Sequence, residues 1–234
     1  MHGQRILKVV KDSRIRWGDG YVDFPFQKNI HQLPREDFLE CLADLVLKED
    51  APSQDFQAML YARFGRGIAE RFLIPYNEKL YATDLSKLDP DAMGRFFPYA
   101  DLRDIVSNFR TRDASSYNAT FTYPEGGAIE YVRALAQPVD PTRIALGESL
   151  VEVDLARRIA RTTHRTVAFE HLVSSAPLPV LLRLAAIPFD PALYTSNKVE
   201  VWNLGFDRKG PAGVHWIYYP QRDVSFYRVG FYDN

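Results

Sequence analysis

The segment from Pro75 to Pro98, PYNEKLYATDLSKLDPDAMGRFFP, gathers residue types that could recognise a charged ligand. The side chains that could contact such a ligand are Tyr76, Asn77, Lys79, Tyr81 and Arg95. The tyrosines offer ring faces and hydroxyl groups, while the lysine and the arginine offer positive charge. A diphosphate bound beside stacked aromatic rings would use this set. The same residues also allow a plainer interpretation, a helix end on which the arginine pairs with Asp89 or Asp91 at the surface.

The sequence lacks the motifs of several common kinds of active site. It contains no GxGxxG, Walker loop, HExxH or CxxC. Its five histidines are far apart in sequence, so we predict no metal site. His215 could face a pocket, but the pattern favours a hydrogen-bonded strand residue, and no nucleophile-elbow glycines surround Ser174 and Ser175. The catalytic residues stay unassigned, and we expect the chemistry from a bound cofactor or from a part of the molecule outside this sequence.

Short-range patterns predict the elements that position these residues. Alternating apolar residues on either side of Gly18 and Gly20 predict two strands joined by a hairpin. Apolar residues at a 3.6-residue period predict helices in LPREDFLECLADLVLKED and in SQDFQAMLYARFG, the second capped by Ser53. We predict that a third helix, in GIAERFLIPYNEKLY, is interrupted at Pro75, which would place residues 76–81 in a kinked end or a loop.

The second half of the chain alternates strands with short helices. Residues 98–121 are polar and predict a mobile loop, and a Pro-Glu-Gly-Gly turn then leads into a helix around Ile129. Several short strands follow, then a short helix in SAPLPVLLRLA, and the last forty residues predict three antiparallel strands. This order predicts an α+β fold, with a helical block and a mostly antiparallel sheet.

Composition excludes several classes of protein. The chain has 234 residues, 46% hydrophobic and 25% charged, and its formal net charge of -1 does not indicate a nucleic-acid partner. Aromatic residues make up 13%, a content typical of a large core or of a pocket that holds rings or sugars. Cys41 lies in an apolar pattern and predicts a buried small hydrophobe. No apolar run reaches the roughly 18 residues of a membrane span, so we expect a soluble, cytoplasmic protein.

The segment at Pro75 resembles a family of flavoproteins. Its order of Tyr, Asn, Lys, Tyr and Arg is similar to the motif Tyr-(Thr/Asn)-x-Lys-x-Trp-Gly followed by Ala-Arg-x-Pro in UDP-galactopyranose mutases and their amine-oxidase-like relatives. The stretches GYVDFPFQKNIHQLP, FTYPEGGAIEYVRALA, HLVSSAPLP and WIYYPQRDVSFYRVGFYDN are similar to other segments of the same proteins. The resemblance therefore covers nearly the whole chain.

The resemblance implies FAD as the cofactor and a UDP-sugar or related small molecule as the substrate. By position, Arg95 would bind the diphosphate, Tyr76 would contact the nucleotide, and Tyr81 would close a loop over it. The remaining substrate-binding residues that we predict are Asn77, Lys79, Tyr219, Phe226 and Arg228. The family binds FAD through an N-terminal GxGxxG unit and a C-terminal segment, and neither is found in this sequence. The chain thus resembles the middle of a flavoenzyme.

The resemblance also implies how the chain is organised. We predict opening strands at residues 1–35, a helical substrate-cap region with the mobile loop at 36–122, and a mixed substrate-binding region at 123–234. These regions would form one continuous unit of a larger flavoprotein, completed by a flavin-binding segment or by a second copy in a homodimer.

The sequence departs from the mutase pattern at three places. Phe226 stands where the family has a tyrosine, Tyr81 stands where it has a tryptophan, and the family's second diphosphate-binding arginine is replaced near Thr195 and Lys198. These departures suggest a different nucleotide sugar, a lipid-linked sugar, or an oxidation of the amine-oxidase or protoporphyrinogen-oxidase kind. A binding module without catalysis is a further alternative.

Overall fold

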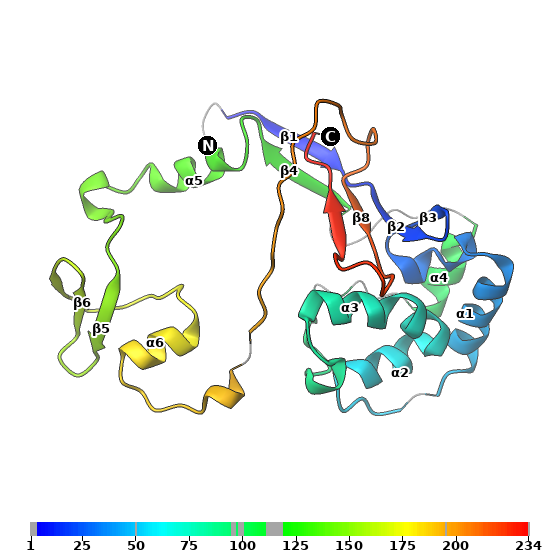
Figure 1. Cartoon of the computed structure of the whole chain (residues 1–234), viewed down its shortest axis with the longest axis horizontal. Helices are drawn as coiled ribbons and strands as arrows, with labels where there is room; N and C mark the ends of the chain where they lie inside the picture. Colours follow the sequence, from blue (N-terminus) through cyan, green and yellow to red (C-terminus); the bar gives the residue numbers. More distant parts are fainter. Residues whose placement is uncertain are drawn as a thin grey trace. The chain divides into compact units, whose positions relative to one another are not determined.

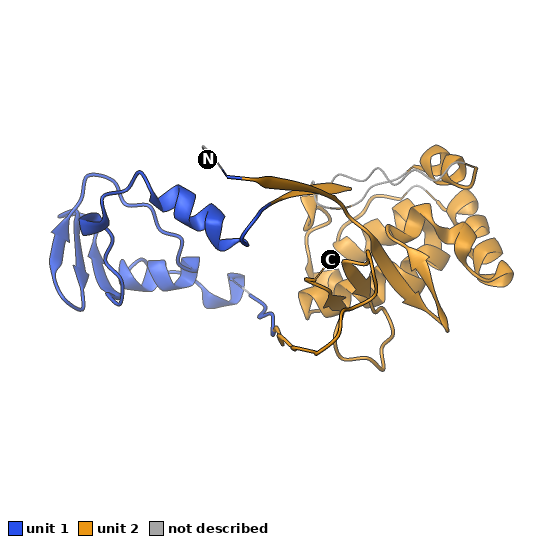
Figure 2. Ribbon diagram, turned by 90° about the horizontal axis from the view of Figure 1, so that it is seen from above, with its two compact units in different colours: residues 1–4, 124–200 blue, residues 5–123, 201–234 orange. Residues whose placement is uncertain are grey.

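The computed structural model describes residues 4–49, 51–94, 97, 101–110, 119–194 and 196–233. The chain divides into two compact units, drawn in different colours in Figure 2. Unit 1 contains residues 1–4 and 124–200, and unit 2 contains residues 5–123 and 201–234. The division of the sequence into three functional regions remains a prediction. The mixture of helices with largely antiparallel sheets confirms the predicted α+β class.

Unit 2 contains a four-stranded sheet that joins both ends of the sequence. Its strand order is β3-β2-β8-β9, with β2 and β3 forming the predicted hairpin and β2 running parallel to β8 (Figure 1). A separate two-stranded sheet pairs β1 with β4. The strands lying mainly in unit 2 are β1 (Ile6–Val10), β2 (Ser13–Trp17), β3 (Gly20–Asp23), β4 (Thr120–Pro124), β8 (Trp216–Tyr218) and β9 (Arg228–Gly230).

The last part of the chain differs from the prediction of three antiparallel strands. Of these, β8 and β9 form, and they pair antiparallel, but β8 also pairs parallel with β2. The segment KVEVWNLGFDRKG has no strand assignment in the structure. The alternating apolar residues of this segment predicted a strand that does not form. Val201, Trp202 and Leu204 are all largely exposed, and no neighbouring strand pairs with them.

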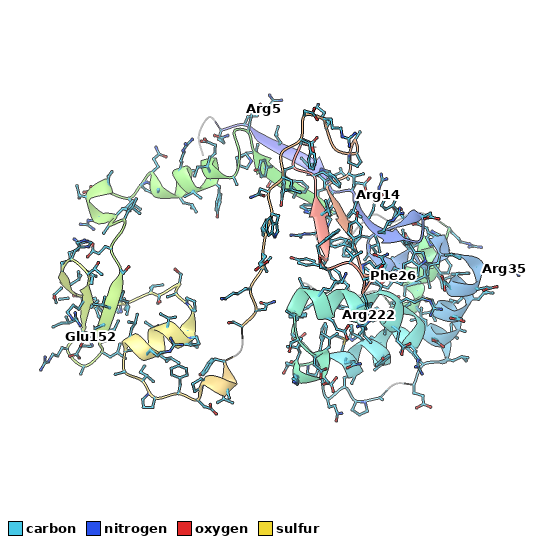
Figure 3. The ribbon with its side chains drawn as sticks, viewed as in Figure 1. Arg5, Arg14, Phe26, Arg35, Glu152 and Arg222 are labelled. Carbon is cyan, nitrogen blue, oxygen red and sulfur yellow. The ribbon has the colours of Figure 1, made fainter. Side chains whose placement is uncertain are left out.

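The helices of unit 2 surround an aromatic core in which Phe26, Phe56, Phe64 and Phe72 are fully buried. Cys41 is buried in the same core, as the sequence predicts. Figure 3 labels Phe26. The helical elements are α1 (Arg35–Leu47), α2 (Phe56–Ile68), α3 (Ile74–Tyr81), α4 (Leu102–Asn108), the π-helix η3 (Ala69–Leu73), and the 3-10 turns η1 (Phe26–Lys28), η2 (Ile30–Gln32) and η4 (Leu85–Lys87).

Two helix ends differ from the sequence prediction. Helix α2 is capped by Asp55, whose side chain accepts a hydrogen bond from Ala58 N at 2.7 Å, and the predicted cap Ser53 lies before it. Pro75 does not interrupt the helical segment, and residues 76–81 are helical. The π-helix ends just before it, so proline occupies the first turn of α3, where a backbone N–H has no intrahelical partner in any case.

Helices α1 and α2 approach closely at a kink in α2. Gly65 has a φ of 71°, and a Cβ atom built there would lie 2.4 Å from the carbonyl oxygen of Asp44. Only glycine fits both the backbone conformation and the contact.

The predicted loop at residues 98–121 contains a helix. Helix α4 begins with a capping box in which Asp101 and Asp104 exchange side-chain and backbone hydrogen bonds. Its end is held by Asn108, whose Nδ2 donates to the carbonyl of Lys28 at 2.7 Å. Residues 98–100 and 111–118 of the predicted loop lie outside the described residues.

Unit 1 has an antiparallel sheet of order β5-β6-β7. Among its described residues, only Val153 and Ala160 are buried. Its other elements are two short helices and two 3-10 turns. The bounds are α5 (Ile129–Ala136), η6 (Pro141–Arg143), β5 (Leu150–Asp154), β6 (Ile159–Thr162), β7 (Thr166–Ala168), α6 (Leu178–Leu184) and η7 (Pro191–Leu193).

Candidate functional site

Tyr76 links the aromatic core of unit 2 to the end of its sheet. Its ring stacks on Phe72 with centroids 5.2 Å apart, and Phe72 stacks on Phe26 in turn. Tyr218 and Tyr227 meet the Tyr76 ring edge-on, at centroid distances of 5.4 and 6.2 Å. Burial, with a contribution from Tyr218, raises the pKa of Tyr76 far above its usual value. The phenol therefore stays protonated and can donate a hydrogen bond.

Arg228 begins β9 and lies over two aromatic rings. Its guanidinium carbon is 5.7 Å from the ring centroid of Tyr227 and 5.9 Å from that of Trp216. Arg228 is directly opposite Tyr218 in the β8–β9 register. Among the described residues it forms no ion pair with a carboxylate, so its charge is not neutralised by the part of the protein that the structure describes.

These four residues, Tyr76, Tyr218, Tyr227 and Arg228, form what we call the tyrosine–arginine site. It combines ring faces, hydroxyl groups and one positive charge at the junction of α3, β8 and β9 (Figure 1). The sequence prediction included Tyr76 and Arg228 and missed the other two tyrosines. The structure brings the predicted pair together although more than half of the chain separates them in sequence.

Lys79 holds the β8–β9 connection against α3. Its ammonium donates hydrogen bonds to the carbonyls of Tyr219 at 2.8 Å, Gln221 at 2.5 Å and Phe226 at 3.3 Å. An ammonium has three hydrogens, so all its donors are used within the protein in this conformation. Desolvation lowers its pKa. The structure thus gives Lys79 a positioning role, and its predicted contact with substrate remains a prediction.

A second interaction ties the same connection to α3. Arg222 pairs with Glu78 at 2.7 Å, and Figure 3 shows Arg222 beside α3. Within the connection, Phe226 packs edge-on against Tyr219 with centroids 4.8 Å apart. Tyr227, the next residue, is the one that faces Tyr76. The sequence could have indicated that Phe226 and Tyr227 face different neighbours, since adjacent residues of an extended segment point to opposite sides.

The other predicted residues of α3 lie toward the core. Asn77 is buried, and its Nδ2 donates to the carbonyl of Leu73 at 2.6 Å, whereas its Oδ1 accepts no hydrogen bond from the described residues. Tyr81 packs edge-on against Phe56 at 5.8 Å, and burial raises its pKa. Arg95, the predicted diphosphate ligand, lies outside the described residues.

Lys11 is a further cation near the site that the sequence did not indicate. Its ammonium is 5.4 Å from the ring centroid of Phe24, which packs against Tyr218 at 5.0 Å. Burial, and secondarily the charge of Arg228, lower the pKa of Lys11 to about 8. No sequence signal could have found this neighbour, because the proximity depends on the pairing of β2 with β8.

The described residues supply groups that can bind and orient a ligand. They contain no cluster of metal-ligating side chains. His215 is committed to the structure, since its Nδ1 accepts a hydrogen bond from the backbone N–H of Asp12 at 3.0 Å. What the tyrosine–arginine site offers is electrostatic attraction, ring stacking and hydroxyl donors, which together orient a ligand and stabilise negative charge. No described helix is both long and apolar enough to cross a bilayer.

Comparisons with known proteins show where this fold occurs. No protein-family model matches the sequence. The structure is similar to a reduced UDP-galactopyranose mutase, with a TM-score of 0.77 and 22% identity over 97% of this chain and 54% of that one. It is also similar to a protoporphyrinogen oxidase-like protein from Exiguobacterium sp. 255-15, with a TM-score of 0.54 and 16% identity over 80% of this chain and 46% of that one. The chain thus shares their fold and spans about half of their length, which confirms the predicted relationship at the level of fold.

The described residues do not form a cradle for the diphosphate of FAD. In a dinucleotide-binding unit, a glycine-rich loop joins a strand of a parallel sheet to a helix whose N-terminus holds the diphosphate. In the parallel pair seen here, β2 with β8, strand β2 leads into β3 through a hairpin instead. These residues therefore support no step through a flavin, and a flavin-dependent activity would need residues other than those described.

Proposed function

We propose that this chain is the substrate-binding portion of a flavin-dependent enzyme that acts on a nucleotide sugar or a related glycan precursor. The observation that carries the proposal is the tyrosine–arginine site, in which Arg228 lies over Tyr227 without a carboxylate partner among the described residues. The likeness in fold to a UDP-galactopyranose mutase supports the choice of substrate class. A bound flavin would supply the bond-forming or redox chemistry.

The residues of this chain would bind and orient the substrate. Arg228 would donate charge-assisted hydrogen bonds to a diphosphate, and the protonated phenol of Tyr76 would donate another. Tyr227 would present a ring face beside them. The predicted roles of Arg95 as a diphosphate ligand and of Tyr219 as a wall of the sugar pocket belong to the same proposal.

Calorimetric titration of the purified chain with UDP-galactose tests this function. We expect binding, and we expect Arg228→Ala to weaken it by about 1.5–3 kcal/mol, or roughly tenfold to a hundredfold. Arg66→Ala is the matched control, because Arg66 is an exposed arginine of α2 that pairs with Glu70. Failure of the unmodified chain to bind UDP-galactose or UDP would refute the nucleotide-sugar proposal.

An oxidoreductase of the protoporphyrinogen-oxidase kind is the second candidate. The observation that favours it is the pairing of Phe226 with Tyr219, which gives this side of the site a phenyl ring where the mutase pattern has a hydroxyl. Such a ring suits an apolar substrate. Visible absorbance of the complete enzyme after addition of FAD separates both enzymes from a binding module without catalysis, since only a flavoenzyme would retain the flavin and stay yellow.

We propose that a flavin-binding polypeptide covers unit 1 in the complete enzyme. Ile129, Val132 and Leu135 lie on one face of α5 and are each at least half exposed. The similar mutase has a further 46% of its length outside the matched region, enough to supply such a cover. Light scattering tests the competing occupant, because a second copy on this face would give a dimer of the purified chain.

A further inference from the structure

Helix α1 carries apolar side chains on two opposite faces. Its inner face places Cys41 and Leu45 in the core of unit 2. Its outer face presents Leu39, Val46 and Leu47, each at least half exposed. Apolar residues on both faces are typical of a helix that is buried on both sides. The outer face of α1 is therefore left uncovered by the part of the chain that the structure describes.

The exposed apolar residues form a stripe that suits packing against another helix. Leu39, Ala43 and Val46 are spaced by four and three residues, and Leu47 follows Ala43 by four, so they lie on one side of the helix. Ala43 is exposed at the middle of this stripe, and its small side chain permits a close approach of two helix axes. A second helix could therefore cross α1 at Ala43.

A cavity of about 460 Å³ lies beside the C-terminal end of the stripe. Its apolar walls come from the end of α1, the loop that follows and α2, and they include Leu47, Pro52 and Ala62. Tyr61 adds an aromatic ring, and its hydroxyl donates to Glu70 at 3.3 Å. Such walls suit a side chain that has an apolar stem and a polar end.

The charges at this cavity favour a positively charged occupant. Asp44 and Glu49 line it, and neither forms an ion pair with another described residue. The two cations that also line it are engaged, because Arg66 pairs with Glu70 at 2.8 Å and Lys48 has an interaction of its own within the chain. An arginine side chain combines an apolar stem with a planar cation that can bind carboxylates and stack on an aromatic ring.

An arginine of this kind begins the same helix. Arg35 is the first residue of α1, is exposed on its outer side (Figure 3), and forms no ion pair with another described residue. The helix rises roughly 18 Å from Arg35 to Leu47, which is too far for Arg35 to reach the cavity of its own chain. Its guanidinium could enter this cavity only in a second molecule.

We propose that two copies of this chain pair through the outer faces of their α1 helices, which run antiparallel, with Arg35 of each copy in the cavity of the other. The apolar stripes would cover each other between the two cavities. This pairing is a property of unit 2, and it is independent of the proposed function.

The positions of the charged and apolar residues agree with one two-fold axis. Arg35 and Glu49 lie seven residues on either side of Leu42. Leu39 and Leu47 lie four residues on either side of the residue after it. A two-fold axis near these neighbouring residues would therefore bring each arginine to a carboxylate and each stripe to the other at once.

Sedimentation-velocity ultracentrifugation of the full chain over a range of concentrations tests this pairing. We expect a dimer, and we expect Arg35→Glu alone or Glu49→Arg alone to raise its dissociation constant about tenfold or more, since each change alters two symmetric contacts. The double variant should dimerise more tightly than either single variant, because it exchanges the two charges. Arg143→Glu, at an exposed arginine of η6 in unit 1, is the matched control and should leave the dimer unchanged.

Two further variants distinguish this face from the exposed face of α5. Val46→Glu should prevent dimer formation, because it would bury a charge between the stripes, and Ile129→Glu should not. A dimer that Ile129→Glu abolishes and Val46→Glu retains would overturn the proposal. So would a monomer at every concentration, or a double variant no tighter than the single ones. Titration of the same samples with UDP measures the proposed function separately, so either proposal can fail without the other.

Discussion

The ammonium group of Lys79 lies 2.8 Å from the backbone carbonyl oxygen of Tyr219, so a side chain of α3 holds the connection that delivers Tyr227 and Arg228. The same group binds two further carbonyls of that connection. The geometry of the tyrosine–arginine site therefore depends on a residue that need not contact a ligand itself.

Replacing Lys79 with methionine should loosen the β8–β9 connection. The three carbonyls would lose their charged donor, and because the side chain is partly exposed we expect a loss of only about 1 kcal/mol in the free energy of unfolding. Hydrogen exchange should rise in residues 219–226, and UDP affinity should fall with it. Lys87→Met, at an exposed lysine of η4, is the control. Unchanged exchange in that segment would contradict the positioning role.

Gly65→Ala should destabilise unit 2 strongly. The new Cβ would meet the carbonyl of Asp44 at 2.4 Å, and alanine is strained at a φ of 71°. We expect a loss of about 3 kcal/mol in urea unfolding. Gly18→Ala separates the two causes, since Gly18 has a φ of 50° and a Cβ added there would have no neighbour within 4 Å, so it should lose only about 1 kcal/mol. Equal losses at the two positions would show that the close helix approach contributes nothing.

Stability should increase with pH through the range in which Lys11 titrates. Its pKa is about 8 in the folded protein and near 10.5 when unfolded, so between these values the unfolded state binds more protons. The free energy of unfolding should therefore rise from about pH 8 toward pH 10, where tyrosines begin to ionise in the unfolded chain. Lys11→Met should flatten this rise. A steeper rise in the variant than in the unmodified protein would contradict the assignment.

Amide hydrogen exchange should be fast in unit 1 of the isolated chain and slow in the core of unit 2. In unit 1 only Val153 and Ala160 are buried among the described residues, so its helices α5 and α6 should exchange quickly. Helix α2, which buries Phe64 and Ile68, should be protected at the level of global unfolding. If α5 were as well protected as α2 in a monomer, unit 1 would be stable without a covering partner.

Local patterns in the sequence are sufficient for several elements of the fold. The Gly18–Gly20 turn predicts the β2–β3 hairpin, and the apolar period predicts α1, because each depends on neighbouring residues alone. Pro75 misleads because its effect depends on the preceding π-helix, which places it in a first turn. The α+β class follows from the order of elements and is confirmed.

The candidate site is predictable only in part. The resemblance in the sequence indicates Tyr76 and Arg228, which the structure brings to one surface. Tyr218 and Lys11 reach the same surface through the parallel register of β2 with β8, in which Ile15 is opposite Tyr218. A register between strands about two hundred residues apart depends on the packed structure as a whole.

The pairing of β2 with β8 also bears on the order of events during synthesis. Residues 13–15 leave the ribosome long before residues 216–218, with which they pair, and nearly all of unit 1 is made in between. Such a high contact order favours slow folding, and the edge of β2 remains open to other chains until β8 arrives. The tyrosine–arginine site is therefore among the last parts of unit 2 to form, and its formation would indicate that the rest of unit 2 has assembled.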